Sequence, residues 1–372
     1  MIEKKRLLSL DFFRGLTVAS MILVNNPGDW GNIYAPLEHS VWNGCTPTDL
    51  VFPFFLFIVG VSIVYAMATK KLNPANHRSI ILKAARRSLT IYALALLLNL
   101  IPRFDFHHLR FLGVLPRIAI VFFICSVIFV KTYRKTQVWI FWSILTAYYF
   151  IMNFIPVPGI GASNLEPSTN LAAWLDTLLL TPNHMWSGSK TFDPEGILST
   201  LPAISTCLLG ILTGTWLQKK DITPDHQVAW LFSVAGLLIL GGLIWNGFFP
   251  MNKALWTSSF VLFAGGLAMA TCTLCYWLID IQGRKKFTEP LIAFGSNAIT
   301  IYVVSGYLPE LLGSIHVIEN GQKSNLWSYG YHQLFTSWLS PLNASVASAL
   351  VYVSLLTIPM IFMYRKKIFI RL

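Results

Sequence analysis

Long apolar segments alternate with short polar connections along the whole chain. Ten segments come close to the roughly 20 consecutive apolar residues that a membrane-spanning helix needs. They cover residues 7–26, 48–68, 80–101, 111–130, 138–156, 196–217, 228–248, 254–279, 291–313 and 344–364. A transmembrane barrel would instead require short segments of alternating hydrophobicity. The pattern therefore predicts an all-α polytopic membrane protein with about ten transmembrane helices.

Two of the polar connections stand out. Residues 27–47 join the first two segments, and residues 157–195 form the longest connection, which is rich in Gly, Pro, Ser, Asn and Trp. Loops of that length are often functional. Within it, "NLAAWLDTLLL" predicts a short helix at the membrane interface. Because no internal repeat or low-complexity tract divides the sequence, residues 1–372 are predicted to form a single transmembrane domain.

The distribution of Lys and Arg predicts the orientation in the membrane. With an even number of spans both termini lie on one side, and the termini and loops of that side hold 18 Lys and Arg residues, against 5 in the loops of the other. Cytoplasmic loops carry the excess of positive charge, so both termini are predicted to be cytoplasmic. The net charge of +12 then reflects this asymmetry and contact with anionic membrane lipid, and it does not indicate nucleic-acid binding.

Composition supports the membrane assignment. Of the 372 residues, 55% are hydrophobic and 12% are charged, whereas a soluble domain has roughly 25% charged residues. Asp11 and Arg14 interrupt the apolar run after the basic N-terminus, so a retained first helix is predicted rather than a signal peptide. Four of the five cysteines lie in apolar segments, which argues against a disulfide framework, and no metal site is expected.

Polar residues in or beside the apolar segments are candidates for a functional site. Asp11 and Arg14 lie three residues apart and share one helix face, so they form either an ion pair that permits insertion or part of a polar cavity. Asn25, at the end of the first segment, is either a helix cap or a site residue. Further polar residues of this kind are Asn252, Lys253 and Asn297.

The connection before the second segment carries an unusual group of side chains. Asp49 is preceded by Thr46 and Thr48, so its carboxylate is either a charge at a helix N-terminus or part of a site. A helix cap does not account for His39, Trp42 and Asn43 in the same stretch. An aromatic ring beside hydrogen-bonding side chains is a common way to hold a sugar ring.

A second group of charged residues lies later in the sequence. Arg110 and Arg117 are seven residues apart, which predicts a basic strip along one face of the fourth helix. Snorkelling at the interface would explain Arg110 better than Arg117. Asp193 and Glu195 flank Pro194 at the start of the sixth segment, where the alternative to a site is a helix cap.

Seven motifs occur in an order that resembles a known family. They are "SLDFFRGLTVASMILVNN", "EHSVWNG", "TDLVFPFFLFIVG", "GVLPRIA", "FDPEGIL", "NKALW" and "YRKKIFI". Together they resemble the heparan-α-glucosaminide N-acetyltransferases, over nearly the whole chain. The resemblance implies transfer of acetyl from cytosolic acetyl-CoA to the amino group of a glucosamine across the membrane. The N-terminal region and the 157–195 loop depart from the animal members, which leaves the acceptor open.

The resemblance also implies roles for individual residues. His39 matches the histidine that the family is thought to use, Asn25 matches the asparagine at the end of the first span, and residues 27–47 become the active-site loop. The acceptor is expected near Trp42, Asn43, Asp49, Arg110, Glu195, Asn252 and Lys253. Acetyl-CoA is expected near Arg14, Arg117, Asn297, Arg365, Lys366 and Lys367, the last three in the closing motif and suited to phosphate.

The chemistry of such a transfer is consistent with these residue types. An amine attacks a thioester only as the free base, and a histidine, with an unperturbed pKa near 6.5, can accept its proton. An amide N–H of Asn25 or Asn43 would stabilise the oxyanion. His39 could instead carry the acetyl group covalently. Direct transfer is favoured because no second acyl-carrying residue is identified.

The setting and the competing interpretation complete the prediction. The N-terminus and the cysteine pattern fit a bacterial inner membrane, with the active-site loop facing the periplasm. A glucosamine-containing wall fragment or scavenged glycan is then the expected acceptor, and a homodimer is left open. The alternative is a multi-span transporter of a sugar or sugar fragment, since intramembrane charges and broken helices occur in transporters.

Overall fold

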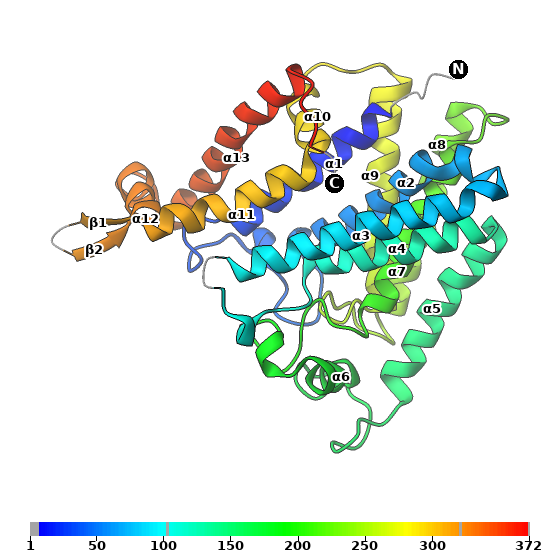
Figure 1. Cartoon of the computed structure of the whole chain (residues 1–372), viewed down its shortest axis with the longest axis horizontal. Helices are drawn as coiled ribbons and strands as arrows, with labels where there is room; N and C mark the ends of the chain where they lie inside the picture. The colour runs from blue at the N-terminus through cyan, green and yellow to red at the C-terminus, as the bar shows by residue number, and fades with distance from the viewer. Residues whose placement is uncertain (1–6, 102–103, 320–321, 371–372) are drawn as a thin grey trace. The chain divides into compact units, whose positions relative to one another are not determined.

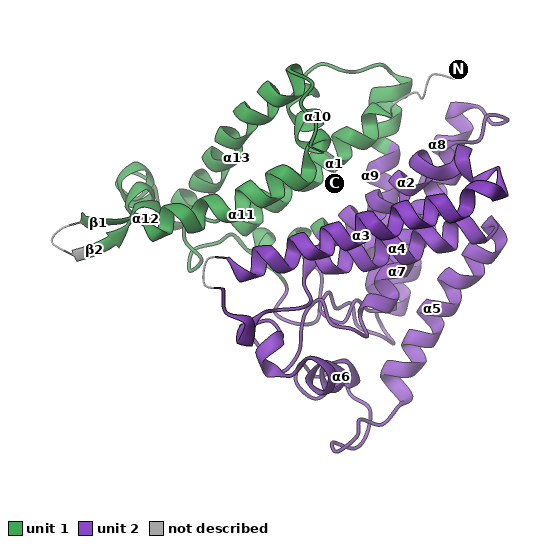
Figure 2. Cartoon of the chain, viewed as in Figure 1, with its two compact units in different colours: residues 1–39, 46–51, 274–371 green, residues 40–45, 52–273, 372 purple. Residues whose placement is uncertain are grey.

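The computed structural model describes residues 7–101, 104–319 and 322–370 and is mostly helical (Figure 1). Its contacts divide the chain into two compact units, coloured separately in Figure 2. Unit 1 comprises residues 1–39, 46–51 and 274–371, and unit 2 comprises residues 40–45, 52–273 and 372. The 27–47 loop therefore contributes to both units.

Unit 2 is a bundle with α7 at its centre. Its helices are α2 (Val51–Lys71), α3 (His77–Leu100), α4 (Val114–Lys131), α5 (Arg134–Phe154), α6 (Leu171–Leu180), α7 (Thr200–Leu217), α8 (Pro224–Trp245) and α9 (Ser258–Cys275). Helix α7 packs against α4, α5 and α8. Gly60 of α2 and Gly210 of α7 let two backbones touch, because a Cβ at either glycine would collide with a carbonyl of the opposite helix. Small residues at such crossings are typical of membrane bundles.

Unit 1 gathers the two ends of the sequence. It contains α1 (Leu8–Asn25), α10 (Glu289–Ser296), α11 (Ala298–Ser314), the antiparallel hairpin β1 (His316–Glu319) and β2 (Gln322–Asn325), α12 (Leu326–Tyr331) and α13 (Pro341–Arg365). Helix α1 packs against α10 and α13. Gly15 and Gly295 make the α1–α10 crossing close in the same way as the glycine pair of unit 2.

Short helical turns complete the secondary structure. The 3-10 turns are η1 (Ala35–Leu37), η2 (Pro47–Leu50), η3 (Pro74–Asn76), η4 (Phe106–His108) and η5 (Pro182–His184), and two π-helical stretches are η6 (Tyr276–Ile281) and η7 (His332–Thr336). The turns η1 and η2 lie on either side of residues 38–46, the part of the predicted active-site loop that carries His39, Trp42 and Asn43.

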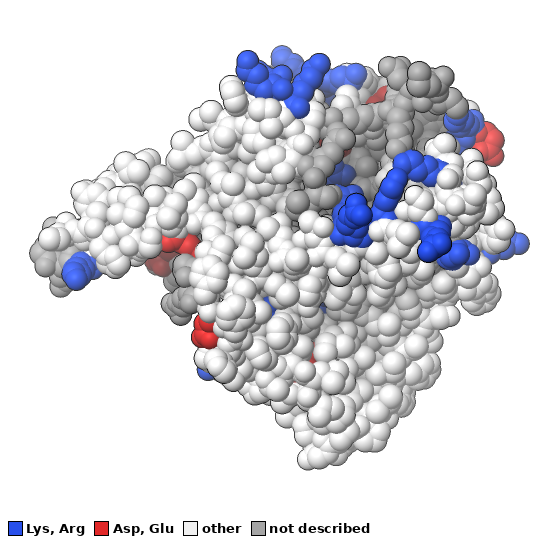
Figure 3. Space-filling model, in the orientation of Figure 1, with Lys and Arg blue, Asp and Glu red and all other residues white. Residues whose placement is uncertain are grey.

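The apolar helices make this an integral membrane protein. Among the described residues, seven helices are long and apolar enough to cross a membrane, or eight if α10 and α11 are counted as one bent span. Helices α3 and α5 have 24 and 21 residues but are not among those seven. The count of ten spans is therefore not confirmed, and the orientation stays a prediction. Figure 3 shows that charged side chains occupy only small areas of a face that is otherwise uncharged.

Three predicted segments differ from the helices observed. The segment 291–313 is broken at Asn297, where α10 and α11 meet at 88°. Helix α4 begins at Val114 because Gly113 has a φ of 140°, outside the helical region. Helix α7 begins at Thr200, because residues 193–197 form a turn closed by the Gly196 N–H and the Asp193 carbonyl. The short helix predicted in the 157–195 loop is confirmed as α6.

Candidate active site

His39 and Asp49 form a hydrogen-bonded pair in the loop between α1 and α2. The His39 Nδ1 atom lies 2.7 Å from Asp49 Oδ1. The two side chains differ in exposure, with 50% of the His39 side chain accessible and 1% of the Asp49 side chain. A buried carboxylate therefore holds a histidine whose ring reaches the surface.

The second carboxylate oxygen of Asp49 shapes the loop. Asp49 Oδ2 accepts the backbone N–H of Thr46 at 3.0 Å, which completes a capping box at η2. The Thr46 hydroxyl donates to the Glu38 carbonyl at 2.6 Å, next to His39. One oxygen of Asp49 thus caps a helix, which is one of the two explanations considered from the sequence, and the other oxygen binds His39.

This geometry selects the tautomer of His39. An ionised carboxylate only accepts hydrogen bonds, so Nδ1 carries the hydrogen that faces Asp49. In the neutral ring the lone pair then lies on Nε2. A histidine oriented in this way by a carboxylate is a suitable general base.

The first span contributes Arg14 and Asn25 to unit 1. Arg14 Nη1 lies 3.0 Å from Asp11 Oδ1, so the ion pair expected from their spacing is present, and Nη1 also donates to the Gly295 carbonyl at 3.2 Å. Asn25 is the exposed last residue of α1. Capping is performed by its neighbour Asn26, whose side chain donates to the Ile22 carbonyl at 2.9 Å.

Trp42 and Asn43 belong to unit 2, where other loops hold them. The Trp42 indole N–H donates to the Leu165 carbonyl at 2.9 Å, and its ring meets Phe192 edge to face with centroids 5.2 Å apart. The Asn43 side-chain oxygen accepts from Asn252 at 3.3 Å. These contacts join residues 42–43 to the loop before α9 and to the 157–195 loop.

The loop before α9 is itself held by a buried side chain. Asn252 is fully buried, and its side-chain oxygen accepts the Leu255 N–H at 2.8 Å. Lys253, the next residue, is partly buried. Asn252 therefore shapes this loop in addition to contacting Asn43.

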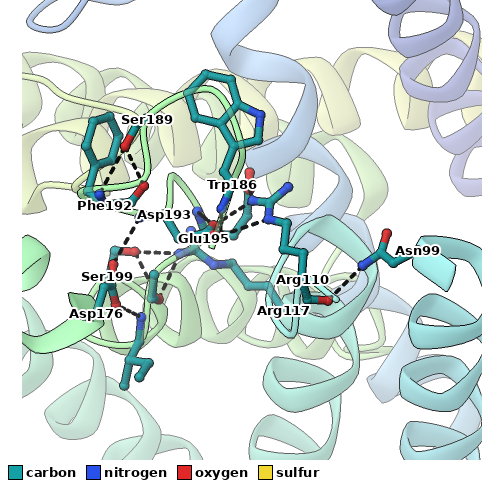
Figure 4. Close-up of polar contacts among 12 residues, drawn as sticks. Asn99, Arg110, Arg117, Asp176, Trp186, Ser189, Phe192, Asp193, Glu195 and Ser199 are labelled. Atoms are coloured by element: carbon teal, nitrogen blue, oxygen red, sulfur yellow. Dashed lines mark hydrogen bonds and ion pairs between the residues drawn. The ribbon is translucent and has the colours of Figure 1, made fainter. Parts of the chain in front are cut away.

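Arg110 forms the centre of a charged cluster in unit 2 (Figure 4). Its guanidinium binds Asp193 through Nε at 2.8 Å and Nη2 at 2.5 Å, and Nη2 also lies 2.6 Å from Glu195 Oε2. Burial lowers the pKa of Arg110, but hydrogen bonding to Asp193 and the charges of both carboxylates raise it above its usual value. The guanidinium is therefore fixed as a cation among acids.

Arg117 lies in the first turn of α4 and is 1% exposed. Its Nη2 donates to the Gly196 carbonyl at 3.1 Å and to the Ser199 hydroxyl at 2.5 Å. Its guanidinium carbon lies 5.1 Å from the ring centroid of Trp256, a cation–π distance. Both arginines thus bind the 193–199 segment. Arg110 binds its two carboxylates, and Arg117 binds a backbone carbonyl and a hydroxyl.

Asp176 of α6 holds that segment from the opposite direction. Its carboxylate accepts the Asp193 N–H at 3.2 Å and the Ile197 N–H at 2.9 Å. Gly196 packs so closely on it that a Cβ there would collide with the carboxylate. Burial raises the pKa of Asp176 to about 6, although the two backbone N–H groups oppose this shift.

The predicted basic strip is wrong in two respects. Arg110 precedes Gly113 and so does not lie on the helix that carries Arg117. The two arginines also face Asp193 and Glu195, whose carboxylates balance their charge. Equally, Asp193 and Glu195 do not cap α7 from its first turn, because they form part of a turn that precedes the helix.

The closing motif lies at one end of unit 1. Asn297 is buried at the α10–α11 break, where its side chain donates to the Ile368 carbonyl at 3.1 Å and accepts the Ile370 N–H at 3.0 Å. Arg365 binds Glu289 through two hydrogen bonds of 2.8 and 3.1 Å.

The two lysines of the closing motif stand apart from these contacts. Lys366 and Lys367 follow directly after Arg365, and both are exposed. Of the three terminal cations, the two lysines are the more accessible to a phosphate group, because Arg365 is engaged by Glu289.

The sequence did not indicate Asp176 and Ser199, which position the charged cluster. The available signal for Asp176 was a lone carboxylate within the apolar run "NLAAWLDTLLL", because a buried acid on an apolar helix needs hydrogen-bond donors. Ser199 gave no signal of its own. The partner of Asp176 was not predictable, since it is a backbone turn 17 to 21 residues away.

Fold and site together define an integral membrane protein with a histidine–carboxylate pair on an exposed loop. Residues 6–242 match the family model described as heparan-alpha-glucosaminide N-acetyltransferase, catalytic. The chain belongs to this family.

Two relatives carry the same name. The mouse heparan-alpha-glucosaminide N-acetyltransferase is 27% identical over 87% of this chain and 58% of its own length. The human protein of that name is 28% identical over 80% of this chain and 52% of its own length. The chain thus spans little more than half the length of these relatives.

Proposed function

We propose that the protein is a transmembrane acetyltransferase that moves acetyl from acetyl-CoA to the amino group of a glucosamine-type sugar. The observation that carries the proposal is the pairing of His39 with Asp49 at 2.7 Å on an exposed loop. This loop lies inside the region that matches the acetyltransferase family. His39 acts as the general base.

The reaction follows from the tautomer of His39. The sugar amine attacks the thioester carbonyl carbon while Nε2 of His39 accepts an amine proton, and Asp49 stabilises the resulting imidazolium. Collapse of the tetrahedral intermediate breaks the C–S bond. The coenzyme A thiolate leaves and takes its proton from His39. Asn25, which ends α1, is the proposed donor to the oxyanion.

The remaining candidates divide between the two substrates. Trp42, Asn43 and the Arg110–Glu195 pair are proposed on the acceptor side, where they line loops of unit 2. The exposed Lys366 and Lys367 are proposed for the coenzyme phosphates. The excess of 18 over 5 basic residues supports cytoplasmic termini. The proposed location is a bacterial inner membrane, with a periplasmic acceptor such as a wall fragment.

The test is transfer of radiolabelled acetyl from acetyl-CoA to a panel of amino sugars. The wild-type protein should acetylate at least one glucosamine derivative, and His39→Ala should bind acetyl-CoA but lose at least about 100-fold in kcat. A folded His39→Ala variant that keeps more than about a tenth of the wild-type rate would exclude His39 as the base. Trapping of labelled acetyl on the wild-type protein would instead favour an acetyl-histidine intermediate.

One observation favours a second candidate, a sugar transporter. The break of 88° between α10 and α11 is of the kind seen in transporters. However, the side chain of Asn297 at this break hydrogen-bonds the backbone of residues 368 and 370, which gives it a structural role. A rise in apparent Tm with acetyl-CoA would favour the acetyltransferase, because a ligand that binds the folded state stabilises it.

A further inference from the structure

Arg117 has hydrogen-bond donors that the fold does not use. A guanidinium carries five N–H bonds, and those of Nη2 go to the Gly196 carbonyl and the Ser199 hydroxyl. The Nε and Nη1 atoms are buried and have no nitrogen or oxygen acceptor among the described residues, although the guanidinium also lies 5.1 Å from the ring centroid of Trp256. Buried donors are nearly always paired, because an unmade hydrogen bond is costly in a medium without water. The arrangement therefore points to an acceptor supplied by something other than the described chain.

The charge around Arg117 argues against an anion as that acceptor. The carboxylates that act on it are Glu195, Asp193 and Asp176. The first two already balance the charges of Arg110 and Arg117, and Asp176 adds further negative charge above pH 6 or so. A phosphate or carboxylate would therefore enter a cluster with no excess of positive charge, whereas a neutral oxygen would not disturb the balance.

The geometry of the guanidinium leads to the same conclusion. Two-pronged binding of a carboxylate or phosphate uses Nη2 together with Nε or Nη1. Arg110 binds Asp193 in this way, through Nε and Nη2. In Arg117, Nη2 already donates to the protein itself, so neither two-pronged arrangement is available to a ligand. The remaining N–H bonds, on Nε and Nη1, point in different directions. Such bonds suit separate carbonyl oxygens along a chain.

We propose that the Nε–H and Nη1–H groups of Arg117 bind neutral carbonyl oxygens of acyl-coenzyme A, either the thioester carbonyl or the amides of the pantetheine arm. This inference rests on the function proposed above. Arg117 is then a binding residue for the uncharged part of the coenzyme. It differs from the exposed lysines of the closing motif, whose chemistry suits phosphate. Ser199 and Gly196 position the guanidinium through Nη2.

The experiment compares the dissociation constants of acetyl-CoA and free CoA for the purified protein in detergent, with apparent Tm as a check on folding. Arg117→Lys keeps the charge but loses the separate N–H groups, and it should weaken binding by at least about tenfold. Weakening confined to acetyl-CoA assigns the thioester carbonyl, and equal weakening of both ligands assigns the pantetheine amides. Unchanged dissociation constants for both ligands overturn the proposal.

Two further variants keep the result interpretable. Ser199→Ala removes one of the two acceptors that hold Nη2, so it should weaken the same ligands by a smaller factor, and it serves if Arg117→Lys does not fold. Ser258→Ala removes another buried hydrogen bond of unit 2, the 2.8 Å bond to the Leu145 carbonyl, and should lower Tm without changing either dissociation constant. Equal loss of affinity in Ser258→Ala would mean that general destabilisation explains the effect, and the proposal would fail.

The outcomes also separate this inference from the proposed function. A wild-type protein that transfers acetyl, with an Arg117→Lys variant that binds both ligands normally, keeps the acetyltransferase and removes Arg117 from the coenzyme site. A wild-type protein that binds neither acetyl-CoA nor CoA removes both. If Arg117→Lys weakened the binding of the amino-sugar acceptor alone, Arg117 would belong to a different site and the coenzyme assignment would be overturned.

Discussion

Replacing Asp49 with Asn tests the histidine–carboxylate pair while leaving its shape almost unchanged. Asp49 Oδ1 binds His39 Nδ1 at 2.7 Å, and Oδ2 accepts the Thr46 N–H at 3.0 Å. An amide has only one oxygen, so it cannot accept both bonds. If the oxygen stays with Thr46, the amide N–H group faces Nδ1, which must then become the acceptor. The hydrogen of the ring moves to Nε2, and the atom proposed to accept the amine proton no longer has a lone pair.

The size of the effect follows from the bond that is lost. A hydrogen bond to a charged group contributes about 1.5–3 kcal/mol. If the bond strengthens only when His39 becomes an imidazolium, its loss lowers kcat by about 10- to 150-fold, at about 1.4 kcal/mol for each factor of ten. The upper limit is the full contribution of a general base, about 10²–10⁴-fold. Asp49→Asn should therefore be slower than wild type but no slower than His39→Ala.

The assay is kcat for radiolabelled acetyl transfer at saturating acetyl-CoA and amino sugar, with Tm measured on the same samples. Thr48→Val is the matched control, because it removes the 3.2 Å bond from the Thr48 hydroxyl to the Pro36 carbonyl in the same loop and leaves the partners of both Asp49 oxygens in place. Loss of a buried hydrogen bond costs about 0.5–1.5 kcal/mol of stability, so this variant should lose Tm and keep its turnover. An Asp49→Asn protein with more than about half of the wild-type kcat would refute the role of the carboxylate.

Three further predictions concern other parts of the chain. Neutralising Lys366 and Lys367 together should raise KM for acetyl-CoA at least about tenfold with little change in kcat, the kinetic pattern of lost ground-state binding, and an unchanged KM would remove them from the coenzyme site. The pKa of Asp176 is raised to about 6 in the folded protein, so its contribution to stability is fully present below its unfolded pKa of about 4 and is lost as pH rises through 6, by up to about 3 kcal/mol. Asp176→Asn should therefore weaken the fall of Tm between pH 4 and 7. An equal dependence of Tm on pH in both proteins would contradict this prediction. Finally, in a Cys45→Ser background, an impermeant thiol reagent on intact cells should label Ser187→Cys and not Thr136→Cys, both at exposed positions, and the reverse pattern would invert the predicted orientation.

The apolar segments were largely predictable because hydrophobic length alone defines a membrane helix. Each predicted segment contains a helix, and the helix ends differ where a single residue overrides the pattern. Gly113, with a φ of 140°, delays the start of α4, and the tertiary contacts of Asn297 accompany the break between α10 and α11. Hydropathy averages over many residues and cannot register such local features.

The site was less predictable than the spans, because its contacts join residues distant in sequence. The sequence indicated His39 and Asp49 separately, but the bond between them depends on the path of the chain through η1 and η2. The 83-residue separation of Arg110 and Asp193 likewise gives no local signal. Side-chain type suggested where chemistry is possible, and only the fold determines which charges neutralise each other.

The arginines show why the pairing of each donor matters more than its presence in an apolar segment. From the sequence, Arg110 and Arg117 formed one class of intramembrane or interfacial cations. In unit 2, Arg110 binds Asp193 through both Nε and Nη2, so replacement of Arg110 would chiefly disturb the 193–199 segment. Arg117 is the more deeply buried of the two and yet has donors without acceptors among the described residues. Burial of a cation is costly in free energy unless its hydrogen bonds are made. A bound carbonyl group would offset this cost at Arg117 by accepting the hydrogen bonds of Nε and Nη1.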